Sequence, residues 1–306
     1  MPNVRFSDRA LILVAGEEAE HFLQNIVTTD LTTLADDEAR PGALLTPQGK
    51  ILFDFLLSKA PGGYRLDCRR DVADDFARRL SLYRLRAKVA ISVEDQPLVG
   101  AAWEDESASS NAESTASRPD STTSRSESTL RDARFPAAAG VGRIYGPAGS
   151  AEVSGDDGTA AWNAIRVAYG IAESGTDYAL GDAFPHDVLL DQTGGVGFRK
   201  GCYVGQEVVS RMQHRGTARR RVLIATAETP LPAPGTPVEA GGRSLGALGT
   251  VSGKAALAIV RVDRVKEAMD AGQPVTAGGV GLSLAIPAWA GFGFPVAPAE
   301  SAAGDA

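Results

Sequence analysis

The chain has 306 residues, of which 43% are hydrophobic and 23% charged, a composition typical of a globular protein with two or more folded regions. Its formal net charge of −7 argues against nucleic acid as a general partner. No apolar run approaches the ~18 residues that a membrane-spanning helix needs, so we expect no membrane partner either.

The N-terminal segments mix helices and strands. Residues 17–27 place apolar side chains on one helical face, and residues 71–85 repeat that pattern, so both segments predict helices. Residues 51–57, ILFDFLL, predict a strand after the turn-like TPQGK. Residues 159–170, TAAWNAIRVAYG, predict a third helix with a glycine stop. Because helices and strands do not alternate regularly, the order favours an α+β fold over a doubly wound sheet.

One segment, at about residues 105–130, differs from the rest in composition. Between Ser107 and Thr129, 13 of 23 residues are Ser or Thr, and none is aromatic or large and aliphatic. Such a segment buries too little apolar surface to offset the entropy lost on ordering, which predicts a disordered insertion. Strand-like LVGAAW precedes it and GVGRIYG follows it, so a loop at a hairpin tip and a linker between two domains are both open.

The sequence pattern changes near residue 221. Short β-type runs, RVLIATA, TPVEA, GTVSG, ALAIVRV and GLSLAI, are separated by turns rich in glycine and proline. This pattern predicts a small antiparallel barrel or sandwich. We therefore expect a folded region over residues 1–220, a β domain over residues 221–296 and a frayed tail over residues 297–306.

The two cysteines, Cys68 and Cys202, lie far apart with no C-x-x-C spacing. This count excludes a disulfide framework and a cysteine zinc site, and it indicates a reducing compartment, which we expect to be the cytoplasm. The N-terminal residues also lack the apolar core of a secretory signal and the composition of an import leader. Cys68 lies in strand-like YRLDCRRD, so we assign it to packing.

Cys202 stands in an unusual context, KGCYVGQE, over residues 200–207. The glycines on each side permit positive φ angles or close backbone approach. A cation at Lys200 would favour the thiolate of Cys202, which is nucleophilic and metal-binding. The alternative for any free cysteine is that it is a small buried hydrophobe.

This motif resembles the signature of the YgfZ-type folate-binding family, whose members are related to the T-protein (aminomethyltransferase) of the glycine cleavage system. The resemblance covers most of the chain except the Ser/Thr-rich insertion and the tail. It extends to LILVAGEEAEHFLQNIVTTDL, LLTPQGKILFDFLL, LYRLRAKVAI and LLDQTGGVGFRKGCYVGQEVVSRMQHRG. The T-protein has a related block without the cysteine.

The resemblance implies a T-protein-like folate-binding α+β region followed by a small C-terminal antiparallel β-barrel. It implies tetrahydrofolate as the cofactor, and a role in making or repairing iron–sulfur clusters together with client or carrier proteins. Such a protein is an accessory or maturation factor rather than a classical metabolic enzyme. The family's hallmark cysteine transfers to Cys202, and its companions transfer to Lys200, Gly201, Tyr203, Gly205, Gln206 and Glu207.

A single cysteine cannot hold a conventional cluster, so we expect no permanent metal site. Three roles remain open for Cys202. The first is a transient contact with a cluster, or a share in a cluster that a partner also binds. The second is thiol chemistry that passes sulfur on to another molecule. The third is a passive place in the lining of the folate site.

Folate requires a flat slot for the pterin and cations for its glutamate tail, which we expect to be polyglutamylated. Arg211 and Arg215, beside the motif, are candidates for the tail because guanidinium groups match carboxylates. Glu173 and Glu207 are candidates for the pterin, whose N–H groups a carboxylate accepts. For each of these side chains, a solvated or ion-paired surface role is the alternative. We assign His186 a structural role.

Two other functions remain open at the level of sequence. One is a folate-dependent one-carbon (aminomethyl-type) transferase, which needs a substrate-activating acid in the folate channel and no thiol. The other is a non-enzymatic folate-binding scaffold. One departure from the family is RDARFP, residues 131–136, which resembles a D-P-R element but has Ala133 at the proline position. This leaves the role of Arg134 open.

Overall fold

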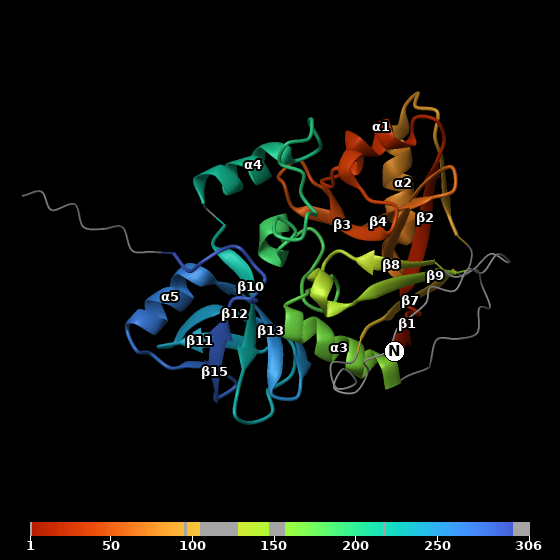
Figure 1. Cartoon of the computed structure of the whole chain (residues 1–306). Coiled ribbons are helices and arrows are strands. Elements are labelled where there is room, and N and C mark those ends of the chain that lie inside the picture. Colours follow the sequence, from red (N-terminus) through yellow and green to blue (C-terminus); the bar gives the residue numbers. More distant parts are fainter. Residues whose placement is uncertain (1, 95–96, 105–127, 147–156, 217, 296–306) are drawn as a thin grey trace, which may run out of the picture.

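A nine-stranded sheet and a closed barrel of six strands lie side by side in the computed structural model, which describes residues 2–94, 97–104, 128–146, 157–216 and 218–295 (Figure 1). The expected α+β fold with a C-terminal antiparallel barrel is therefore confirmed. The strands of the sheet are β1 (Asn3–Arg5), β2 (Arg9–Ala15), β3 (Glu38–Leu45), β4 (Ile51–Ala60), β5 (Gly63–Arg69), β6 (Ala90–Val93), β7 (Leu98–Ala102), β8 (Ser128–Asp132) and β9 (Gly142–Gly146).

The sheet has the order β1-β7-β9-β8-β3-β4-β5-β2-β6, and all its pairs are antiparallel except β3 with β8. It curls so that strands distant in this order face each other. Arg143 of β9 donates from Nε to Oδ2 of Asp67 on β5 at 2.8 Å, and both side chains are buried. Arg9 of β2 donates to Oδ1 of the same carboxylate at 2.7 Å. A buried charge is tolerated here because it is paired and hydrogen-bonded on both oxygens.

Helices α1 (Ala19–Gln24) and α2 (Ala73–Arg84) cover the outer face of β2, β4 and β5, on the side of the sheet remote from the barrel (Figure 1). Phe22 and Leu23 of α1 and Phe76 and Leu80 of α2 are buried against this face. Both helices are predicted by their apolar spacing, as is α3 (Asp157–Tyr169). Cys68 packs in this core, where burial raises the pKa of its thiol to about 12.

The Ser/Thr-rich segment itself lies outside the described residues, but its flanking strands are placed. β7 and β8 both belong to the sheet and lie on either side of β9, each paired with it. The segment is therefore an insertion within one sheet and not a linker between independent domains. The two strand-like runs on either side of it, LVGAAW and GVGRIYG, form β7 and β9, and these pair antiparallel as the expected hairpin requires. β8 is an additional strand that lies between them in the chain. The expected frayed tail, residues 297–306, lies outside the described residues.

The barrel closes in the order β10-β13-β12-β11-β14-β15. Its strands are β10 (Arg220–Thr226), β11 (Pro237–Ala240), β12 (Arg243–Ser252), β13 (Ala255–Arg261), β14 (Val275–Ala277) and β15 (Val280–Ala285). Helix α5 (Val262–Asp270) follows β13 directly and buries Val262, Val265 and Ala268 against the barrel. Sequence patterning did not separate this helix from the strand before it, because the apolar run continues across their boundary.

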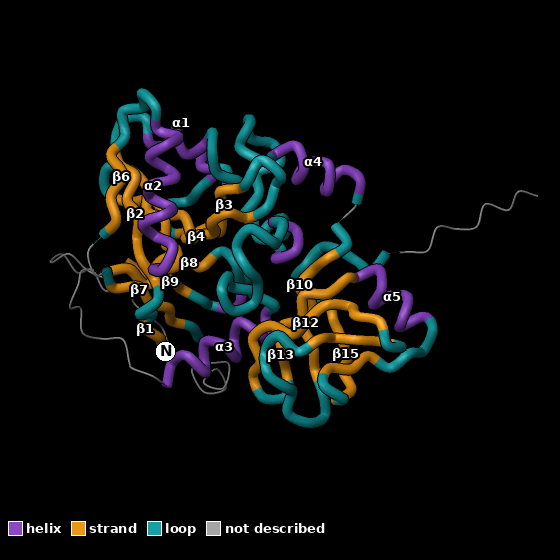
Figure 2. The backbone as a smooth tube through the Cα atoms, turned by 180° about the vertical axis from the view of Figure 1, so that it is seen from behind, coloured by secondary structure: helices purple, strands orange, loops and turns teal. Residues whose placement is uncertain are grey.

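Helix α3 joins the sheet region to the barrel (Figure 2). Its Arg166, which is 1% exposed, donates from Nη1 to Oδ2 of Asp177 at 2.9 Å and from Nη2 to Oγ1 of Thr250 on β12 at 2.9 Å. Asp177 in turn accepts the Thr250 backbone N–H at 2.6 Å. Gly249 leaves room for this carboxylate, because a Cβ there would lie 2.6 Å from Oδ1 of Asp177.

The segment after β15 returns from the barrel to the sheet region. Trp289 donates its indole N–H to the carbonyl oxygen of Tyr169 at 2.7 Å, and the Gly291 backbone N–H donates to Oε1 of Gln192 at 2.9 Å. The chain thus ties its two parts together twice, once through α3 and once through this segment.

Replacement of Arg166 by methionine is expected to lower the free energy of unfolding by about 3–5 kcal/mol, because it leaves Asp177 and its neighbours without their buried cation. Urea denaturation measures the change. Arg78→Met is the control, since the exposed Arg78–Asp75 pair on α2 contributes less than about 1 kcal/mol. A loss at Arg166 as small as the loss at Arg78 would contradict this account of the junction.

Candidate functional site

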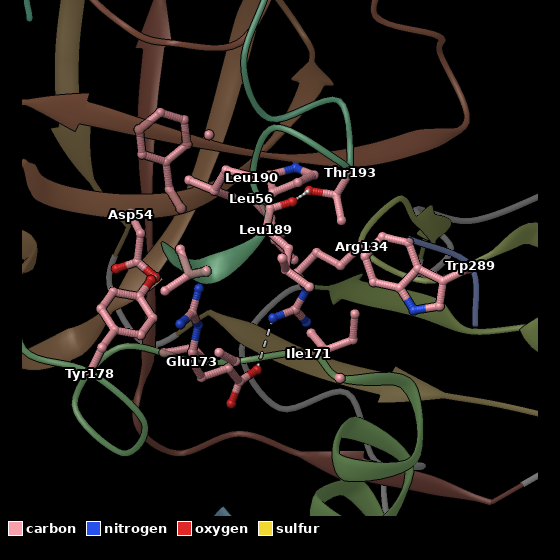
Figure 3. A pocket seen from close by; sticks show the side chains of 17 residues that line it. Asp54, Leu56, Arg134, Ile171, Glu173, Tyr178, Leu189, Leu190, Thr193 and Trp289 are labelled. Atoms are coloured by element: carbon pink, nitrogen blue, oxygen red, sulfur yellow. Dashed lines mark hydrogen bonds and ion pairs between the residues drawn. The ribbon is translucent and has the colours of Figure 1, made fainter. Parts of the chain in front are cut away.

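A narrow cavity lies where the sheet, α3 and the segment after β15 meet. Asp54 and Tyr178 stand at one end and Trp289 at the other, with Arg134 and Glu173 between them (Figure 3). Leu189 and Leu190 form an apolar wall. The cavity volume is about 30 Å³, so the cavity is a narrow slot in this structure.

Asp54 brings a carboxylate to the cavity from the middle of β4, a strand whose other residues are mostly apolar. Its Oδ1 accepts the Ser174 hydroxyl at 2.6 Å, and its Oδ2 accepts the Tyr178 hydroxyl at 2.9 Å. Because an ionised carboxylate has about four acceptor positions, two hydrogen bonds leave Asp54 able to accept more. Burial raises the pKa of Tyr178 well above its usual value, so Tyr178 remains a donor.

Glu173 is held between two arginines. Its Oε1 accepts from Nη1 of Arg134 at 3.0 Å, and its Oε2 lies 3.3 Å from Nε of Arg166. Burial by itself would raise the pKa of Glu173, but Arg166 and Arg134 outweigh it and hold that pKa far below its usual range. Glu173 is therefore a fixed anion rather than a proton donor. Arg134 in turn is anchored by the buried Asp132, whose Oδ2 accepts from Nη2 at 2.7 Å.

The cavity borders a wider groove with a volume of about 440 Å³, because Arg134, Thr193 and Trp289 line both. The groove carries three arginines against one glutamate, Glu38. Arg131 donates to Oε2 of Glu38 at 2.5 Å and is partly exposed, and Arg40 is bonded to Glu38 as well. The net charge of this lining is positive, so the groove attracts anions.

The structure separates the residues that sequence reasoning proposed for folate. Glu173 lies in the cavity. Glu207, Arg211 and Arg215 lie on α4 (Gln206–Arg215), where they are exposed, and they line neither the cavity nor the groove. Glu207 and Arg211 instead form an exposed pair one helical turn apart. Their closeness to the motif in sequence does not bring them to the cavity, because α4 leads away from it (Figure 1).

Among the cavity residues that were not proposed as ligand contacts from sequence are Asp54, Arg134, Tyr178 and Trp289. Asp54 carried a signal, since an acid in the middle of the apolar run ILFDFLL is unusual for a buried strand. Arg134 was noticed only through the RDARFP element. Trp289 had no local signal, because only the return of the chain from the barrel brings it to the sheet region.

The KGCYVGQE motif forms a loop that ends at the start of α4. Gly201 and Cys202 are exposed, whereas Lys200 and Tyr203 on either side are buried. None of the motif residues lines the cavity or the groove, so Cys202 lies on a surface separate from both. Tyr203 and the cavity wall nevertheless belong to one apolar cluster, which contains Leu189 and Leu190.

Lys200 is not hydrogen-bonded to the thiol. Its Nζ donates to the carbonyl oxygens of Val27 and Thr29, each at 2.7 Å. These contacts give Lys200 a role in holding the backbone, and its effect on the Cys202 thiolate stays a prediction. Gln206 and Glu207 begin α4, and Gly205 before them has a φ of 79°, in the region that favours glycine.

His186 has structural contacts. It is buried, its Nε2 lies 3.2 Å from Oε1 of Gln213 on α4, and burial lowers its pKa. Within the described part of the chain, no group of three or more His, Cys, Asp or Glu side chains is arranged to hold a metal ion. In the same residues, no helix is both long and apolar enough to cross a membrane.

Comparison with known proteins agrees with this architecture. Residues 219–292 match the family described as "CAF17, C-terminal beta-barrel domain". The solved structure of the glycine cleavage system aminomethyltransferase T from Bartonella henselae superposes with a TM-score of 0.68 and 18% sequence identity, over 93% of this chain and 84% of that one. At this identity the likeness establishes the fold.

Among curated proteins, the chain is 33% identical over 239 residues to the iron–sulfur cluster assembly factor IBA57 homolog of Chaetomium globosum, which covers 71% of this chain and 54% of that protein. It is 28% identical over 305 residues to human iron–sulfur cluster assembly factor IBA57, which covers 93% of this chain and 84% of that protein. The chain thus spans about half the length of its fungal relatives and most of the human one.

These relatives are named as mitochondrial proteins, which contradicts the expected cytoplasmic location. That expectation was based on the low cysteine count, which indicates a reducing compartment but does not distinguish one such compartment from another. The resemblance of the chain to the YgfZ-type family is confirmed: its homologues are the iron–sulfur cluster assembly factors of the IBA57 type, built on the fold of the glycine cleavage T-protein with a CAF17-type barrel.

Proposed function

We propose that this chain is an assembly or repair factor for iron–sulfur clusters that binds tetrahydrofolate in its cavity and acts through Cys202. The names of its relatives support the first part of the proposal. The observation that carries the folate part is the slot with Asp54 and Glu173, which continues into the groove that contains Arg40 and Arg131.

The cavity has the groups that a pterin ring requires. Asp54 retains free acceptor positions for the N–H groups of an aminopyrimidine edge, and Tyr178 and Ser174 hold its carboxylate in place. The apolar wall and the Trp289 ring offer flat surfaces for the ring faces. Because the slot is narrow, entry of the ring requires side chains at its open end, Trp289 above all, to move.

The groove suits the glutamate tail. Arg131 is 44% exposed and bonded to Glu38 through one nitrogen, Nη2, so it keeps donors for an added carboxylate. Arg40 is engaged by the backbone and side chain of Thr33 as well as by Glu38, and its contribution is charge rather than free donors. In this proposal, Arg131 replaces Arg211 and Arg215 as the contact for the tail.

Cys202 supplies one exposed thiol, and the described residues place no set of metal ligands around it. A cluster that it touches must therefore take its other ligands from a partner, such as an iron–sulfur client or carrier protein. Of the three roles open at the level of sequence, a transient contact with a shared cluster fits this exposure best.

A second function is favoured by one observation. Asp54 places an acid in the folate cavity, which is what an aminomethyl-type transferase needs, and such an enzyme would work without a thiol. The two functions differ in their dependence on Cys202, so they are separable by experiment.

Replacement of Asp54 by asparagine is expected to weaken tetrahydrofolate binding by roughly tenfold or more, because a charge-assisted hydrogen bond contributes about 1.5–3 kcal/mol. Isothermal titration with tetrahydrofolate measures this. Glu207→Gln is the matched control and should bind as wild type does, since Glu207 lies outside the cavity. Unchanged affinity in Asp54→Asn with weakened affinity in Glu207→Gln would place the pterin elsewhere.

In cells that lack this protein, wild type is expected to restore the activity of a [4Fe–4S] enzyme relative to the amount of that enzyme, and Cys202→Ser is expected not to. Wild type and Cys202→Ser should bind tetrahydrofolate equally, because Cys202 lines neither the cavity nor the groove. Equal rescue by Cys202→Ser would remove the thiol from the mechanism. Formation of methylenetetrahydrofolate from an aminomethyl donor by that variant would then support the transferase.

A further inference from the structure

The KGCYVGQE loop is fixed to the body of the protein at two points, one on each side of Cys202. Gly201 between them faces open space, since no atom outside Gly201 and its two chain neighbours lies within 4 Å of where its Cβ would be. Gly201 and Cys202 therefore form a short exposed arch between the buried side chains of Lys200 and Tyr203. The position of the Cys202 thiol is therefore set by these two points of attachment, which we call anchors, and not by contacts of the thiol itself.

The second anchor, after the cysteine, is a contact between glycines. A Cβ on Gly205 would lie 2.5 Å from the carbonyl oxygen of Thr46 and 3.1 Å from Cα of Gly49. Thr46 and Gly49 form the turn between β3 and β4, closed by the Gly49 N–H donating to the Thr46 carbonyl at 2.9 Å. The glycine in the motif is needed here for both its positive φ and its lack of a side chain.

The first anchor, before the cysteine, is the segment Val27–Thr29, which follows α1 and is itself tied to β3. The Thr28 N–H donates to the Ala43 carbonyl at 2.9 Å, and the Ala43 N–H donates to the Thr28 hydroxyl oxygen at 2.9 Å. The same hydroxyl donates to the carbonyl of Gly195 at 2.6 Å, and the Gly197 N–H donates to the Thr28 carbonyl at 2.8 Å. The chain that leads into the motif is thus already docked on this segment.

Lys200 completes that docking. Its side chain crosses Gly197, where a Cβ would lie 2.8 Å from Cδ of Lys200, and its Nζ then bridges the carbonyls of Val27 and Thr29. The ammonium also lies 5.3 Å from the centre of the Tyr203 ring, which joins the two buried side chains of the arch. Both backbone carbonyls would lose a donor if this nitrogen were removed.

We propose that Lys200 is a positioning residue, which clamps the start of the arch to Val27 and Thr29 and thereby fixes where the Cys202 thiol is presented. This inference rests on the proposed function in so far as Cys202 acts on a partner. The alternative is that Lys200 acts on the thiol electrostatically. The two roles differ in what happens when the charge is removed but the aliphatic stem is kept, as in Lys200→Met.

The charge of Lys200 also has a thermodynamic signature. Burial lowers its pKa from 10.5 to about 8, against the attraction of Asp30, which raises it. Tyr203 is the other titratable group that faces it, and burial raises the pKa of Tyr203 to about 12. Between pH 8 and 10.5 the unfolded chain holds the Lys200 proton more often than the folded chain, so folding becomes more favourable as pH rises through this window.

The difference in unfolding free energy, wild type minus Lys200→Met, is therefore expected to rise between pH 8 and 10, because the variant lacks the titrating group. Urea denaturation at a series of pH values measures it, and other groups cancel in the difference. A difference that does not change with pH would mean that Lys200 is solvated, and the clamp would be wrong.

The direct test compares wild type, Lys200→Met and Arg199→Met. Arg199 is exposed and adjacent, so its replacement removes one positive charge from the same loop without touching the clamp. Hydrogen–deuterium exchange of peptides over residues 199–204 reports the order of the arch. Alkylation of Cys202 by iodoacetamide across pH reports thiol ionisation. Buried Cys68 adds no signal near neutral pH, and Cys202→Ser gives the background.

For Lys200→Met we expect exchange of the arch to quicken by about tenfold or more. We expect the midpoint of the alkylation profile to stay within about 0.3 pH unit of wild type. Rescue of the [4Fe–4S] enzyme should fall while tetrahydrofolate binding persists, and Arg199→Met should match wild type in all four measurements.

A midpoint raised by about one pH unit or more with unchanged exchange would assign Lys200 to activation and overturn the proposal. Wild-type exchange and rescue in Lys200→Met would overturn it as well. If Cys202→Ser rescues fully, the proposed function fails, but the exchange measurement still decides whether Lys200 holds the arch.

Discussion

Arg166 is the residue on which the arrangement of the two parts of this protein depends. It is buried at the point where α3, the Glu173–Asp177 loop and barrel strand β12 meet, and it contacts a carboxylate or hydroxyl from each neighbour. Both terminal nitrogens of its guanidinium are hydrogen-bonded, and its Nε lies 3.3 Å from Oε2 of Glu173, so the charge is paired on two sides and the geometry of this junction is tightly constrained. The sheet region and the barrel consequently meet in one defined orientation.

That orientation is what creates the cavity. β4 supplies Asp54, the loop after β8 supplies Arg134, the loop after α3 supplies Glu173 and Tyr178, and the segment after the barrel supplies Trp289. No single segment contains the site. A ligand that entered the slot would touch both parts of the chain, and its binding energy would add to that of the junction.

A helix or strand was predictable from the sequence where the apolar residues of a segment follow one clear spacing, either that of a helix or that of a strand. α2, α3 and the barrel strands follow directly from apolar spacing and turn residues. The helix α5 was missed because its apolar face continues the pattern of β13. The cavity was only partly predictable, since it depends on contacts between residues as distant as Asp54 and Trp289. Glu173 was found because it follows a helix in a loop, whereas Arg211 and Arg215 were chosen by closeness to the motif, and the direction of α4 takes them elsewhere.

Tyr203 has a consequence for how the protein works as a whole. It neighbours Cys202 in the chain, and its ring packs in the same apolar cluster as Leu189 and Leu190, whose other side forms the cavity wall. Leu189 and Leu190 thus belong both to the cavity wall and to the cluster that holds Tyr203, whereas Cys202 does not line the cavity. If a ligand in the slot changed the affinity of the arch for a partner through this cluster, the partner would change the affinity of the slot for that ligand by the same factor.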